Sequence, residues 1–121
     1  MAEGFLTTHI LDTANGIPAH GVRIQLYRLE AGTGQRTLLT ECITNDDGRT
    51  DTPILGKEDF AIGQYELIFQ IGDYFRQKGL KAEEPLFLDE IPLRFGINDV
   101  QSHYHVPLLA SPYSFSTYRG S

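Results

Sequence analysis

The sequence predicts an all-β sandwich, and three observations lead to that fold class. Apolar and polar residues alternate with period two through several short segments, turn-forming residues separate these segments, and only one short stretch is typical of a helix. At 121 residues the chain fits a single domain, which we expect to span 1–121. A chain of this size buries about two-thirds of the surface that its unfolded form exposes, which is enough for a core without disulfides.

The clearest alternation lies in three central segments, 21–29, 63–71 and 89–97. Each segment places apolar side chains on one face and mostly polar side chains on the other, which predicts half-buried strands. In the second segment the apolar face carries Tyr65, Leu67, Phe69 and Ile71. Pro92 has no amide hydrogen to give to a strand ladder, so we expect the third segment at a sheet edge or beside a bulge.

Further strands are expected in four segments that bring the total to seven or eight: 5–12, 37–45, 102–109 and 112–118. Glycine, asparagine, aspartate and proline gather between the strands, as turns require. The one predicted helix covers 72–79, with Asp73 as its N-cap and Gly79 at its end. The acidic stretch 80–90 is expected to be a solvated loop.

Composition restricts the partners and the compartment. The formal net charge of −6 argues against nucleic acid and anionic membranes as partners, so an anionic ligand would need a local group of arginines such as Arg49 and Arg119. The single cysteine, Cys42, cannot form an internal disulfide. The first residues show neither a basic segment nor a long apolar run, so we expect no signal peptide, no membrane helix and a cytoplasmic location.

Histidine and arginine are the candidate catalytic residues. His103 and His105 share the polar face of the segment 102–109, His9 lies in 5–12, and Arg49 follows Gly48 in a turn. Imidazole can accept a proton from water near neutral pH and return it. Arginine can hold a carbonyl-rich or anionic ligand and stabilise developing negative charge. Together these groups would suit the hydrolysis of a polar heterocycle.

Each of these residues also has a structural explanation. Strand histidines are often surface residues or structural ones, a turn arginine such as Arg49 can simply be solvated, and a last residue such as Ser121 is often disordered. His20, in a turn rich in glycine and proline, is expected at the surface. A third interpretation is a metal site, because three histidines with an open position can hold catalytic zinc.

Three blocks of the sequence, 6–22, 44–51 and 103–121, resemble the transthyretin-related family of 5-hydroxyisourate hydrolases. The likeness covers nearly the whole chain. The ending Tyr-Arg-Gly-Ser, at 118–121, is the hallmark of the hydrolases. Transthyretin carriers have an otherwise similar block, but they lack this ending and have no histidine at the position of His105.

The resemblance implies a transthyretin-like (prealbumin-like) β-sandwich of two four-stranded sheets with one short α-helix. It also implies a homotetramer, a dimer of dimers with its sites at the subunit interface. The implied reaction belongs to urate degradation and converts 5-hydroxyisourate into 2-oxo-4-hydroxy-4-carboxy-5-ureidoimidazoline. No metal or organic cofactor is expected. The alternative is a non-enzymatic carrier of a small aromatic ligand on the same scaffold.

The resemblance also assigns roles to individual residues. It implies four catalytic residues, His9, Arg49, His105 and Ser121. It implies that substrate is bound by Arg49, Tyr118, Arg119 and Gly120. His103 is left as a structural or supporting residue, because carrier relatives can also keep a residue of this kind there.

Overall fold

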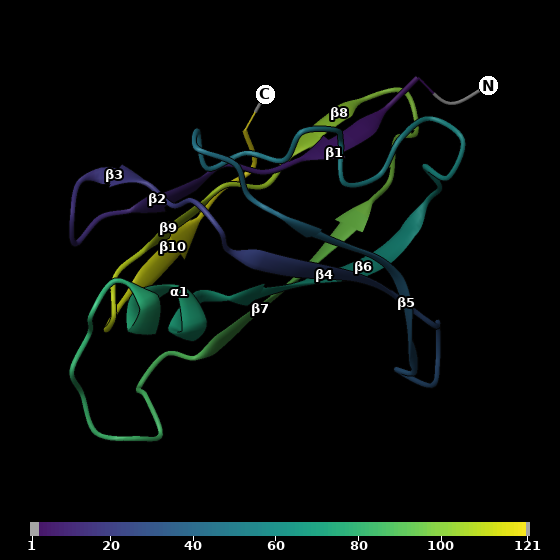
Figure 1. The fold of residues 1–121 in the computed structure, drawn as a ribbon. Coiled ribbons are helices and arrows are strands. Elements are labelled where there is room, and N and C mark those ends of the chain that lie inside the picture. Colours follow the sequence, from purple (N-terminus) through teal and green to yellow (C-terminus); the bar gives the residue numbers. More distant parts are fainter. Residues whose placement is uncertain (1–2, 121) are drawn as a thin grey trace.

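The computed structural model describes residues 3–120, whose strands form two four-stranded sheets and one two-stranded sheet (Figure 1). The strands and the helix are, in chain order, β1 (Phe5–Thr7), β2 (Ile10–Asp12), β3 (Ile17–Pro18), β4 (Arg23–Leu29), β5 (Arg36–Ile43), β6 (Gly63–Gln70), α1 (Ile71–Gln77), β7 (Glu90–Ile97), β8 (His103–His105), β9 (Leu108–Ala110) and β10 (Phe115–Thr117). No helix in this part of the chain is long and apolar enough to cross a membrane.

The predicted pair of four-stranded sheets with one short helix is confirmed. One sheet has the order β5-β4-β6-β7 and is antiparallel throughout. The other has the order β10-β9-β2-β3, and its central pair, β2 and β9, is parallel. The two-stranded sheet of β1 and β8 was not predicted, because the segments 5–12 and 102–109 were each expected to form a single strand.

The break in both segments has a local cause. The β1–β8 and β2–β9 ladders are both parallel and keep the same register, so they are two parts of one interrupted pairing. Between them the buried hydroxyl of Thr8 donates to the carbonyl oxygen of Val106 at 2.7 Å, a group that a continuous parallel ladder would offer to a backbone amide. Pro107, the next residue, has no amide hydrogen of its own.

The core lies between the sheets and is built from the predicted alternation. Tyr65, Leu67 and Phe69 of β6 are fully buried, as are Ile24 and Leu26 of the neighbouring β4. Strand β7, which contains the proline at position 92, is the edge strand of its sheet, as expected. The long strands β4, β6 and β7 form one layer, and the shorter strands lie in a second layer that faces it (Figure 1).

One residue of the polar face departs from the expected pattern. Glu66 of β6 is only 5% exposed, although alternation places it on the outer face of the sheet. Its carboxylate accepts hydrogen bonds from Arg36 at 2.8 Å and from Arg94 at 2.9 Å, on strands β5 and β7. This paired charge ties three strands of the sheet together across its outer surface.

The helix begins earlier than predicted. Helix α1 starts at Ile71, directly after β6, because this residue is fully buried and continues the apolar face of the strand. Its N-cap is Gln70, without a side-chain cap, so the predicted capping role of Asp73 is wrong. Asp73 lies in the first turn and pairs with Arg76 at 2.8 Å. The acidic loop that follows is largely exposed, but Glu84 also binds Arg76.

Candidate active site

The parallel pairing of β1 with β8 places a threonine opposite a histidine. Thr7 is the register partner of His105, and Phe5 is the partner of His103. Because side chains alternate along a strand, these four side chains lie on the same face of the small sheet. The intervening partners Leu6 and Tyr104 point into the core.

The hydroxyl of Thr7 lies between two imidazole rings. Its Oγ1 is 2.6 Å from Nε2 of His103 and 2.8 Å from Nδ1 of His105. On the other side of this pair, the ring of Phe5 stacks on His103, with ring centroids 4.2 Å apart. The positions of both imidazoles are therefore fixed by packing and by hydrogen bonds to a single oxygen atom.

Arg49 comes to this surface from a tight turn. Gly48 precedes it with a φ of 74°, and a Cβ at this position would collide with the carbonyl oxygen of Ile10. The Gly48 carbonyl in turn accepts a hydrogen bond from the Ile10 amide at 2.8 Å. Only glycine satisfies both the backbone angle and the close approach. The turn therefore packs directly against β2, and the next side chain, Arg49, lies near the histidines.

His9 lies between β1 and β2 and is half-buried. Burial lowers its pKa, and the nearby positive charge of Arg49 lowers it further, while a hydrogen bond with the Asp47 backbone acts in the opposite direction. The turn that carries Arg49 thus also contacts the ring of His9.

The pKa of His105 is lowered by burial first and then by three neighbouring groups, Arg49, His103 and His9. The lowered pKa favours the neutral imidazole at neutral pH. A neutral imidazole has one nitrogen with a free lone pair, as a general base requires.

The C-terminal segment closes the other side of His105. The amide of Gly120 donates to the carbonyl oxygen of His105 at 2.7 Å. A Cβ at position 120 would lie 2.6 Å from Cδ2 of the imidazole, so the glycine backbone packs directly on that edge of the ring. Nδ1 is bound to Thr7 and Cδ2 is covered by Gly120, whereas no residue among 3–120 hydrogen-bonds Nε2 of this ring, which lines the cleft described next.

Arg49 and His105 border a cleft of about 370 Å³, whereas His9 and Gly120 are not among the residues that line it. The rest of its wall is formed by Thr7, Thr8, His103 and the segment 50–53, which supplies two threonines, an aspartate and a proline. Sequence reasoning missed Thr7 and the segment 50–53 as parts of the site. The alternation already placed Thr7 on the same side as His9, but the parallel pairing that brings it to His105 has no local sequence signal.

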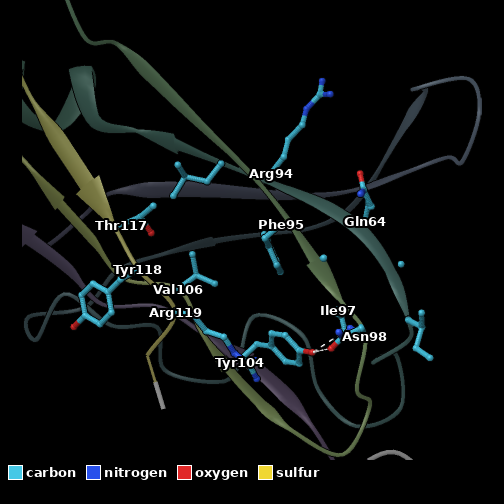
Figure 2. A pocket seen from close by; sticks show the side chains of 14 residues that line it. Gln64, Arg94, Phe95, Ile97, Asn98, Tyr104, Val106, Thr117, Tyr118 and Arg119 are labelled. Atoms are coloured by element: carbon cyan, nitrogen blue, oxygen red, sulfur yellow. Dashed lines mark hydrogen bonds between the residues drawn. The ribbon is translucent and has the colours of Figure 1, made fainter.

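The structure places two of the predicted substrate-binding residues elsewhere. Tyr118 and Arg119 border a second cavity, of about 620 Å³, together with Tyr104 (Figure 2). Tyr104 alternates with His103 and His105 along β8, so this cavity lies on the opposite face of the strand. The guanidinium of Arg119 lies over the ring of Tyr104, 4.1 Å from its centroid. Within one chain these two residues do not reach the histidine cleft, and their contact with substrate stays a prediction. Ser121 lies outside the described residues.

Two further candidates have ordinary surroundings. His20 is exposed, as expected, and its Nδ1 lies 3.3 Å from Asp46. Burial raises the pKa of the Cys42 thiol to about 11, with a smaller contribution from Glu41, so this cysteine is a weak nucleophile. Residues 3–120 contain no group of three histidine, cysteine, aspartate or glutamate side chains placed to hold a metal ion.

Comparison with known proteins decides the family. The model of the HIUase/Transthyretin family matches residues 6–120. The chain belongs to this family. It is 59% identical to 5-hydroxyisourate hydrolase 2 of Rhizobium meliloti (strain 1021) over 98% of both chains. It is 56% identical to 5-hydroxyisourate hydrolase of Pseudomonas aeruginosa over 98% of this chain and 92% of that protein.

Solved structures of the family have the same fold. A crystal structure of (S)-allantoin synthase matches 99% of this chain with a TM-score of 0.91 and 54% identity, and the match spans 44% of that longer chain. Klebsiella pneumoniae 5-hydroxyisourate hydrolase matches with a TM-score of 0.79 and 32% identity, over 98% of this chain and 99% of that one. Transthyretin from Sparus aurata matches with a TM-score of 0.84 but only 25% identity, over 95% of both chains.

Proposed function

We propose that this protein is a 5-hydroxyisourate hydrolase that uses His105 as its general base. The observation that carries the proposal is the cleft that both His105, bound to Thr7 through Nδ1, and the charged Arg49 line. The proteins that it resembles over nearly their whole length are named for this activity.

The reaction is the addition of water to a ring carbonyl followed by cleavage of the adjacent carbon–nitrogen bond. Nε2 of His105 takes a proton from water as the water oxygen attacks the carbonyl carbon of the six-membered ring. The carbonyl electrons move onto oxygen, then re-form the double bond as the bond to the ring nitrogen breaks. The proton held by the histidine is returned to that nitrogen. The product is 2-oxo-4-hydroxy-4-carboxy-5-ureidoimidazoline, with one water added in total.

Arg49 and His9 assist the attack of water and the departure of the ring nitrogen. The guanidinium of Arg49 orients the carbonyl-rich substrate and stabilises the oxyanion that forms on attack. His9, which lies beside the same turn, orients the substrate or donates the proton to the leaving nitrogen. A local positive charge on Arg49 also attracts a substrate that the net charge of −6 would repel at long range.

The remaining parts of the proposal concern the terminus and the assembly. Tyr118, Arg119 and Gly120 bind substrate, and Ser121 supplies a hydroxyl and the terminal carboxylate near the histidines. For Tyr118 and Arg119 this requires a cleft completed by a neighbouring subunit, in line with a homotetramer. We further propose that the enzyme works in the cytoplasm without a metal or organic cofactor, and without nucleic acid or membrane partners.

The carrier alternative finds less support. The chain is far closer in sequence to the hydrolases named above than to the transthyretin of Sparus aurata. A related transthyretin structure was solved in complex with thyroxine, an aromatic ligand. A carrier would not need an open histidine nitrogen beside an arginine.

The test uses 5-hydroxyisourate made freshly from urate and urate oxidase, with its decay followed by ultraviolet absorbance. We expect the protein to accelerate the decay, and we expect a chelator to leave the rate unchanged. A chain extended beyond Ser121 is expected to lose activity because the terminus is proposed to be part of the site. Decay no faster than the spontaneous reaction would refute the hydrolase proposal, and binding of thyroxine would then test the carrier.

A further inference from the structure

We propose that Thr7 is a positioning residue that determines which nitrogen of His105 carries the proton, with His103 as the partner at the other end of the same hydroxyl. The inference rests on the proposed function, in which Nε2 of His105 must be the free base. It is carried by the two contacts of Thr7 Oγ1, at 2.6 Å to His103 Nε2 and 2.8 Å to His105 Nδ1.

The argument starts from a count of protons. A hydroxyl group has one hydrogen, so Thr7 can donate to only one of the two rings. Both contacts are within hydrogen-bond distance, so at least one ring must donate its own N–H to the oxygen. The protonation of one imidazole is therefore linked to that of the other through the hydroxyl.

One arrangement leaves His105 ready to act as a base. In this arrangement Nδ1–H of His105 donates to the Thr7 oxygen, and the Thr7 hydroxyl donates to Nε2 of His103. Both contacts of the Thr7 oxygen are then hydrogen bonds. The Nε2 atom of His105 then keeps its lone pair toward the cleft. In the reverse arrangement the Thr7 hydroxyl would donate to Nδ1 of His105. The proton of neutral His105 would then be on Nε2, and this atom could not accept a proton from water. In a catalytic triad, the wrong tautomer of the base lowers kcat by about 10⁴.

Neighbouring residues hold Thr7, His103 and His105 in place. Phe5 stacks on His103 with an angle of 19° between the rings, and the Gly120 backbone packs on the Cδ2 edge of His105. Thr7 itself is fixed by the register of β1 with β8. Neither ring can turn without losing these contacts, so the hydroxyl meets the same two nitrogens throughout the reaction.

Charged and titratable groups reach His105 from three neighbouring elements. Arg49 approaches from the turn before the segment 50–53, His9 from the connection between β1 and β2, and His103 from β8. Asp51 is the acidic residue of the cleft wall. The positive neighbours oppose protonation of His105, whereas an oxygen that accepts from Nδ1–H favours it. Removal of the Thr7 hydroxyl should therefore move the acidic limb of the rate profile to lower pH.

The kinetic experiment compares Thr7→Val, Thr7→Ser and Thr13→Val with the native protein. Thr7→Val keeps the shape of the side chain, and we expect kcat to fall by at least about tenfold, as for loss of a hydrogen bond that orients a functional histidine. KM should stay the same, and the acidic limb of the pH–rate profile should move to lower pH. Thr7→Ser should restore most of kcat. Thr13→Val removes a hydroxyl bond of 3.1 Å to Ala110, between the same two chain segments but away from the cleft, and should change neither quantity.

His103 is tested by a double variant. His103→Phe keeps an aromatic ring for Phe5 to stack on but removes the nitrogen that meets Thr7. If the two residues act through one hydroxyl, His103→Phe combined with Thr7→Val should lose no more activity than Thr7→Val alone. Additive losses would overturn the role of His103.

A measurement without substrate separates this proposal from the proposed function. Long-range ¹H–¹⁵N spectra of the native protein should show the proton of neutral His105 on Nδ1, and Thr7→Val should shift it toward Nε2. The role of Thr7 would be overturned if the proton of His105 were on Nε2 in the native protein. It would also be overturned if Thr7→Val left the tautomer, kcat and the acidic limb of the pH–rate profile unchanged. A native protein that fails to accelerate the decay of 5-hydroxyisourate would refute the hydrolase instead, whatever the tautomer.

Discussion

Gly120 and His105 are joined twice, once through the backbone and once by direct packing. The amide of Gly120 donates to the His105 carbonyl at 2.7 Å, and the same residue leaves no room for a Cβ beside the imidazole. The backbone at residue 120 is thus held against the proposed base by a contact that only glycine permits. The preceding residues, Tyr118 and Arg119, turn to the other side of β8.

Gly120→Ala is expected to impair catalysis without unfolding the protein. The added methyl would meet Cδ2 of the ring at 2.6 Å and push the imidazole or the terminus aside. A displacement of about 1 Å at a reacting group can cost about 10²-fold in rate. We expect a loss of this order in kcat, measured with freshly made substrate. Gly56→Ala is the matched control, because a Cβ there meets no atom within 4 Å. Equal activity of both variants would contradict the prediction.

His105→Asn should remove most of the activity. Asparagine keeps a polar group of similar reach but has no basic nitrogen, and a positioned general base contributes about 10²–10⁴-fold. We expect kcat/KM to fall within that range, while circular dichroism and the unfolding midpoint stay close to native. His20→Asn, at an exposed position, should retain native activity. Near-normal turnover of His105→Asn would exclude this residue as the base.

Arg49→Gln should change the pH dependence as well as the rate. The positive charge of Arg49 lowers the pKa of both His9 and His105, in addition to the larger effect of burial. Without that charge both pKa values rise, so the acidic limb of kcat/KM should move to higher pH. The rate at the optimum should also fall, because the oxyanion loses its charged partner. Arg23→Gln, in an exposed pair with Glu41, serves as the control and should move neither.

Stability should depend on these histidines in the range around their ordinary pKa. His9 and His105 have lowered pKa values in the folded protein, so near pH 6.5 the unfolded chain binds more protons than the folded one. The free energy of unfolding should therefore decrease as the pH falls through this range. Urea unfolding at pH 7.5, 6.5 and 5.5, at one protein concentration, would measure it. A His9→Asn and His105→Asn double variant should show a weaker dependence than the native protein.

The long strands of the fold could be predicted because their alternation is local. Strands β4, β6 and β7 place every predicted inward residue toward the core, since period two is a property of consecutive residues. The start of helix α1 was missed because Ile71 fits both the end of a strand and the first turn of a helix. Burial of Glu66 depends on an arginine from the adjacent strand β7 and another from β5, two strands away, which no local pattern indicates.

The site could be predicted only in part. His9, Arg49 and His105 were expected from residue chemistry and from family resemblance, and the structure brings them to one region. Thr7 was missed as a site residue because its importance arises from a parallel register with residues almost one hundred positions away. The placement of Arg119 over Tyr104 was missed because the ring and the arginine meet only after the segment that follows β8 has folded back.

The parallel pairing of β1 with β8 also affects how the protein is made. All four strands of sheet β5-β4-β6-β7 are made before β8. Strand β1 is synthesised first but must wait for His103–His105 before it has a partner. The proposed catalytic group therefore forms only after β8 has been made, and a chain truncated before β8 would lack His103, His105 and two strands of the second sheet.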